Sequence, residues 1–133
     1  MAEKQQINSF RDLDVWKRGI QLVTHVYDVS KSFPQSELYG LTNQIRRSAV
    51  SVPSNIAEGR MRGHKAEFRQ FLFIALGSLA EIETQLIIAD ELGYIEKEKK
   101  EQIIEEMDIL GRQMRSLISK LTHSTIVPKT HNP

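Results

Sequence analysis

The sequence contains no cysteine, and this absence removes several kinds of chemistry together. Thiolate catalysis, cysteine-based zinc sites and disulfide bonds are all excluded. The first ten residues lack the apolar core of a signal peptide, and no apolar run is expected to approach the length of a membrane span. We therefore expect a cytoplasmic protein that contacts no membrane.

Motifs for catalysis and metal binding are also missing. A di-metal centre in a helical bundle needs a Glu-x-x-His pair on each of two helices, and no such pair occurs. The histidines do not converge on one predicted helix seam; they are His25, His64, His123 and His131. The turn GRMRG lacks the GKS or GKT ending of a phosphate-binding loop. We expect no enzyme activity, no metal and no cofactor.

The formal net charge is only +1, so the chain is not a polycation. Its 133 residues fit one domain with one hydrophobic core. Any attraction for nucleic acid must therefore come from uneven placement of charge along the chain.

Four segments show the hydrophobic periodicity of helices, at about 12–32, 36–59, 65–92 and 96–121. Short connections between long helices force neighbours to run antiparallel. The sequence thus predicts an all-α, up-down-up-down four-helix bundle over residues 10–122. An N-terminal arm, 1–9, and a flexible C-terminal tail, 123–133, would flank it.

The first segment carries two apolar stripes about 120° apart. We assign one to the bundle core, and it comprises Leu13, Trp16, Ile20, Val23 and Tyr27. The other would contact a second subunit, and its interface residues are Val15, Leu22, Val26 and Val29. A single wide core face is the alternative interpretation.

Pro53 lies inside the second segment, where proline costs about 3 kcal/mol in a helix interior. The apolar line through Ile45, Val52 and Ile56 continues past it without a change of phase. This favours one helix bent at Pro53 over two short helices. In the third segment, the stretch FLFIALGSLA is apolar on more than one side and is expected to be the most buried part of the chain.

Charge is unevenly distributed between two regions of the chain. Residues 43–69 are mainly basic, whereas residues 81–108 are mainly acidic. The candidate phosphate-binding residues are Arg46, Arg47, Arg60, Arg62 and Lys65. The same residues could instead pair with acidic residues such as Glu101 or Glu105 on a neighbouring subunit. Both interpretations stay open at this point.

Three segments carry a family resemblance: FRDLDVWKRGIQLV, YGLTNQIRRSAVSVPSNIAEG and EFRQFLFIALGSLAEIETQL, followed by ELGYI. From about Phe10 to Ile95 the chain resembles the proteins encoded in bacterial 23S rRNA intervening sequences. It also resembles their relatives, the accessory variability determinants of diversity-generating retroelements.

The resemblance implies a homopentameric barrel of four-helix protomers. In the retroelement relatives, a positive surface engages nucleic acid and a reverse transcriptase. Carried to this chain, the matched basic pair is Arg46 and Arg47, and the turn after it is often basic in relatives. The leading hypothesis is a non-enzymatic oligomer that binds structured RNA or DNA, with a nucleic-acid-processing protein such as a reverse transcriptase as a further partner. The alternative is a purely structural oligomer or protein-interaction module.

Overall fold

The computed structural model describes residues 9–123, and these form four long α-helices preceded by or joined through short 3-10 turns. The α-helices are α2 (Asp14–Ser30), α3 (Leu41–Met61), α4 (Lys65–Glu91) and α5 (Lys97–His123). The 3-10 turns are η1 (Phe10–Asp12) and η2 (Gln35–Glu37). Apart from Ser9 and His123, the predicted arm and tail lie outside the described residues.

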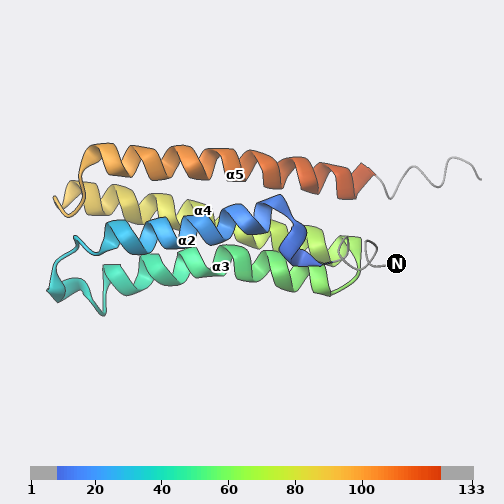
Figure 1. Ribbon diagram of the computed structural model, residues 1–133, viewed down its shortest axis with the longest axis horizontal. Coiled ribbons are helices and arrows are strands. Elements are labelled where there is room, and N and C mark those ends of the chain that lie inside the picture. Colours follow the sequence, from blue (N-terminus) through green and yellow to red (C-terminus); the bar gives the residue numbers. More distant parts are fainter. Residues whose placement is uncertain (1–8, 124–133) are drawn as a thin grey trace, which may run out of the picture.

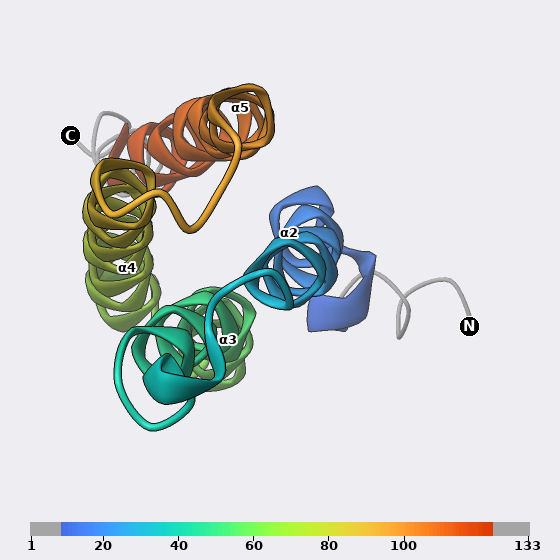
Figure 2. The same cartoon turned by 90° about the vertical axis from the view of Figure 1, so that its left-hand side faces the viewer.

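The helices run antiparallel in sequence order, as Figure 1 shows. Viewed end-on, α3 and α4 are neighbours, with α2 beside α3 and α5 beside α4 (Figure 2). The α3–α4 pair packs most extensively, and the α2–α5 contact is the smallest of the four. The predicted all-helical bundle is therefore confirmed for the protomer.

Pro53 lies within α3, which continues unbroken on both sides of it. The prediction of one helix rather than two is confirmed. The proline ring packs against Gly19 of α2, where an added Cβ would lie 3.2 Å from the Pro53 Cβ atom. Gly59 serves the same purpose against α4, because an added Cβ would lie 2.6 Å from the Cβ atom of Phe71. Both glycines let neighbouring helices approach closely.

Both apolar stripes of α2 pack against the protomer core, so the alternative of a single wide core face is confirmed. Leu13, Trp16 and Val23 of the stripe assigned to the core do pack there. The assignment of the other stripe to a second subunit was wrong. Leu22 and Val26 are fully buried within the single chain and Val15 is 5% exposed, so these residues form the protomer core and cannot contact a second subunit. Val29, the fourth expected interface residue, is half-buried and packs against the same core. Ile20 and Tyr27, expected in the core, are each 39% exposed. The periodicity gave the angle between the stripes but not that both of them pack inward.

The stretch FLFIALGSLA is not the most buried part of the chain. Phe73 and Ile74 are 56% and 48% exposed, because only one side of α4 packs against the bundle. By length and composition, α4 is also long and apolar enough to cross a membrane. Of its most apolar window, 33% is buried inside the bundle. This corrects the expectation that no apolar run approaches that length. The core helix of a soluble bundle passes the same test.

Candidate nucleic-acid interface

The structure separates the five predicted basic residues into two groups. Arg46 and Arg47 lie in the first third of α3, whereas Arg60 and Arg62 lie at its end and Lys65 begins α4. The helical rise from Arg46 to Arg60 amounts to about 20 Å. A single phosphate-binding patch made of all five residues is therefore not formed within one protomer.

Arg46 is committed to contacts between α2 and α3. Its Nε atom donates a hydrogen bond to Ser30 Oγ at 2.8 Å, and an Nη atom donates to the carbonyl of Tyr27 at 3.3 Å. The guanidinium also lies 4.6 Å from the centre of the Tyr27 ring, a cation–π geometry. Arg47 is exposed beside it. Arg46 thus stabilises the helix pair, and much of its hydrogen-bonding capacity is already used.

The second group surrounds the turn between α3 and α4. Arg62 donates to Glu58 Oε2 at 3.0 Å and lies 5.0 Å from the centre of the Phe71 ring. Such an exposed i,i+4 ion pair is worth only about 0.3–0.5 kcal/mol, so Arg62 can exchange Glu58 for a phosphate at little cost. Arg60 is half-buried, and Lys65 is exposed.

The antiparallel fold adds basic residues that sequence reasoning did not include. α5 ends at the same end of the bundle as the α3–α4 turn (Figure 1). After Asp108, α5 contains no acidic residue. We call the resulting surface the basic end, and it comprises Arg60, Arg62, Lys65, Arg69 and Lys120. Acidic residues at this end are Asp12, Asp14, Glu58 and Glu67.

A signal for the α5 contribution was present in the sequence. Acidic residues occupy the first half of this helix, and basic residues occupy the second. Antiparallel packing of α4 and α5 places that second half beside the start of α4, so this charge asymmetry becomes a surface only when the two helices pack together.

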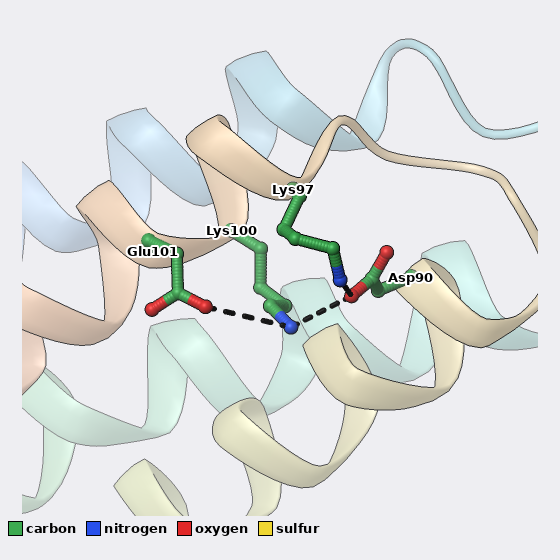
Figure 3. A network of polar contacts seen from close by, with 4 residues as sticks. All are labelled: Asp90, Lys97, Lys100 and Glu101. Atoms are coloured by element: carbon green, nitrogen blue, oxygen red, sulfur yellow. Dashed lines mark hydrogen bonds and ion pairs between the residues drawn. The ribbon is translucent and has the colours of Figure 1, made fainter.

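At the opposite end of the bundle, two lysines are paired with a carboxylate of the same chain. Asp90 Oδ2 accepts hydrogen bonds from Lys100 Nζ at 2.7 Å and from Lys97 Nζ at 2.9 Å, joining α4 to α5 (Figure 3). The hydrogen bond from Lys100, followed by that from Lys97, lowers the pKa of Asp90. The same contact with Asp90 raises the pKa of Lys100. These lysines are thereby engaged with a carboxylate of their own chain.

A second carboxylate contact closes this end. Tyr94 Oη donates to Glu37 Oε2 at 3.0 Å, and this hydrogen bond raises the pKa of Tyr94. Another oxygen of the same carboxylate, Glu37 Oε1, accepts from the backbone N–H of Leu41 at 2.9 Å and caps the start of α3. The two ends of the bundle thus differ in chemistry.

No arrangement suited to metal binding occurs within residues 9–123, where no three His, Asp or Glu side chains gather as ligands. Of the histidines, His25 contacts Glu106, with Nδ1 and Oε1 2.8 Å apart. The serines on α3 serve packing between helices: Ser51 hydrogen-bonds to Ser78, and Ser48 donates to Glu81 Oε1 at 3.3 Å. The expected absence of enzyme activity and cofactors stays a prediction.

Comparison with known proteins bears on the family. Among curated proteins, none matches the chain significantly. A solved structure from Bacteroides thetaiotaomicron VPI-5482, described as a protein of unknown function from the S23 ribosomal protein family, shares 25% sequence identity. The alignment covers 78% of this chain and 97% of that one, with a TM-score of 0.72.

The sequence profile of one protein family covers most of the bundle. It is the family described as "23S rRNA-intervening sequence protein", and it matches residues 11–116. The relation to retroelement accessory proteins, and with it a reverse transcriptase as partner, stays a prediction. With this match over most of its length, the chain belongs to the 23S rRNA-intervening sequence protein family.

Proposed function

We propose that this protein is a non-enzymatic homo-oligomeric scaffold that binds structured RNA through the basic end of each protomer. The observation that carries the proposal is the convergence of basic residues from α3, α4 and α5 at one end of the bundle. Membership of an rRNA-related family favours RNA as the nucleic acid. The pentameric barrel implied by the sequence resemblance is part of the proposal.

The chemistry of the basic end suits phosphate rather than base edges. Arginine offers a planar fork for two parallel hydrogen bonds to phosphate oxygens, and lysine offers a mobile positive charge. Such contacts position a nucleic acid without reading its sequence. We therefore expect recognition of RNA shape and charge, with little dependence on base sequence.

Oligomerisation would supply the affinity that one protomer lacks. With a formal net charge of +1, a single chain should bind nucleic acid weakly at physiological salt. A ring formed by rotation about an axis along the bundle would place every basic end on one face. Simultaneous contacts by several protomers would then multiply the binding.

The test is fluorescence anisotropy of a labelled, structured rRNA fragment at about 50 and about 200 mM salt. In the variant Lys65→Glu/Lys120→Glu, two exposed lysines of the basic end are reversed. We expect weaker binding and a shallower salt dependence, by about one phosphate contact for each lysine.

The matched control is Lys31→Glu/Lys99→Glu, which makes the same change in net charge at the opposite end. It should bind nearly as well as the wild type. Equal losses in both variants would mean that only total charge matters. No binding by the wild type at low salt would leave the purely structural oligomer as the better description.

A further inference from the structure

α4 carries an apolar face that the protomer does not cover. Five large side chains on this helix are between 42% and 56% exposed, and they are Phe73, Ile74, Ile87, Ile88 and Leu92. We call them the α4 apolar face. Gly77 lies between them, and a Cβ added there would meet no atom within 4 Å. Along the helix, the exposed Glu81 and Thr84 separate the cluster of Phe73 and Ile74 from the cluster of Ile87, Ile88 and Leu92. Exposed apolar clusters on one helix are typical of a protein contact.

A second uncovered surface lies on the other side of α3. Here α2 and α3 border a groove of about 510 Å³, lined by Tyr27, Leu38, Thr42, Asn43, Arg46, Arg47, Val50 and Ser51. The apolar residues at this groove are 38–41% exposed and comprise Tyr27, Leu38 and Val50. The contacts of Arg46 with Ser30 and Tyr27 hold one wall in place.

The two surfaces have opposite charges around them. Between Gln70 and Leu92, α4 has four acidic residues and no basic one. The α2–α3 groove is bordered by two arginines. Within the described residues, Arg47, Glu83 and Glu91 take part in no ion pair. Unpaired charges of opposite sign beside two apolar surfaces favour contact between those surfaces in different copies.

We propose that the α4 apolar face of one protomer packs into the α2–α3 groove of a second copy. This inference rests on the oligomeric scaffold proposed above and identifies the surfaces that would assemble it. Packing of α4 against α4 is disfavoured, because it would bring acidic residues together. A head-to-tail contact between two different surfaces closes into a ring when the rotation permits, and it leaves the basic ends on one face.

The two surfaces lie at similar positions along the bundle axis, as such a ring requires. Ser51 lies opposite Ser78, and Ser48 lies opposite Glu81. Because α3 and α4 are antiparallel, residues 42–50 of α3 are level with about residues 79–87 of α4. Rotation about an axis along the bundle keeps each residue at its level. The groove would then meet the part of α4 around Ile87, with Glu83 near Arg47.

Light scattering after size exclusion tests the contact with two variants. Ile88→Arg alters the α4 apolar face, and its new charge would face the arginines of the groove. Val50→Asp alters the groove, and its new charge would face the acidic residues of α4. Each variant alone should retain wild-type helicity by circular dichroism and elute with the 15.3 kDa mass of one chain. Ile20→Arg, at an isoleucine that is 39% exposed elsewhere on α2, should keep the wild-type mass.

Mixing the two variants is decisive, because the mixture contains one intact α4 apolar face and one intact groove. We expect assembly to return, to at least twice the mass of one chain. A Val50→Asp variant that stays fully assembled, or a mixture that stays monomeric, would overturn the proposal, as would a monomeric wild type. RNA anisotropy on the same samples separates the two proposals. Assembly without RNA binding refutes the basic end and leaves the interface standing. RNA binding by a monomeric wild type refutes the interface and the oligomeric part of the scaffold, and leaves the basic end standing.

Discussion

At the scale of single residues, burial and pairing decide which side chains support the fold. Leu22 is fully buried between the helices, while Ile20, two residues earlier on α2, is 39% exposed. Arg46 shows the same principle among charged residues, since its contacts with Ser30 and Tyr27 make it part of the packing between α2 and α3. Residue type alone did not distinguish it from the exposed Arg47.

The contrast between the two α2 residues gives a stability prediction. Leu22→Ala should lower the free energy of unfolding by about 2–5 kcal/mol, because it removes buried methyl groups and leaves a cavity. Ile20→Ala should cost about 1 kcal/mol or less, since much of that side chain is already in water. Urea unfolding at equal protein concentration measures both. A larger loss for Ile20→Ala would restore the original assignment of the two stripes.

At the scale of elements, polar contacts fix how helix ends meet. The Asp90 carboxylate joins the end of α4 to the first turn of α5 through Lys97 and Lys100 (Figure 3). Gly93, with a φ of 77°, provides the turn between them. The chain can therefore reverse direction within a few residues, and the contacts of Asp90 fix the position of α5 along α4.

This contact makes stability depend on acid. The pKa of Asp90 is lower in the folded protein than its unfolded value of about 3.9, mainly because of the hydrogen bond from Lys100. Its contribution is thus present above about pH 3.9 and is lost as the pH falls through the lowered folded pKa. Asp90→Asn should lower the melting temperature at neutral pH, and its curve should approach that of the wild type in acid.

Differential scanning calorimetry between about pH 2 and 7 measures this difference. The control is Glu105→Gln, which neutralises an exposed carboxylate on α5 that takes part in no ion pair within the described residues. The melting temperature of that variant should equal that of the wild type across this pH range. If the melting temperature of Asp90→Asn is below that of the wild type by the same amount at every pH, the charge of Asp90 does not contribute to stability.

At the scale of the whole molecule, topology determines where charge and apolar surface gather. Antiparallel helices bring the end of α5 to the α3–α4 turn, so basic residues far apart in sequence share one end (Figure 1). The same arrangement leaves the α4 apolar face and the α2–α3 groove on different sides of the protomer. Assembly and RNA binding would therefore use separate surfaces.

This separation predicts how assembly affects affinity. Ile88→Arg leaves the basic end intact, yet its loss of assembly should weaken RNA binding by about 100-fold or more through lost multivalency. Titration of the labelled rRNA fragment at one fixed salt concentration measures the change. An unchanged affinity in a monomeric variant would show that each protomer binds RNA alone. The added arginine by itself favours RNA binding, so a loss of affinity cannot come from its charge.

The sequence by itself determined the helices, their order and the family. Hydrophobic periodicity located three of the α-helices to within about two residues at each end and predicted the passage of α3 through Pro53. It began α3 at residue 36, whereas residues 35–37 form η2 and α3 starts at Leu41. Periodicity locates helices because the 3.6-residue period is a local property of the chain. The family resemblance rested on long segments whose spacing is also contained in the sequence.

Only the tertiary structure decided which faces point inward and which charges lie together. A helical period fixes the angle between two stripes but not their orientation relative to the other helices, so one stripe of α2 was assigned to a subunit contact although both pack inward. α4 has more apolar side chains than the other three helices of the protomer cover. The contribution of α5 to the basic end comes from antiparallel packing. These properties depend on contacts between segments distant in sequence, which is why periodicity and composition did not reveal them.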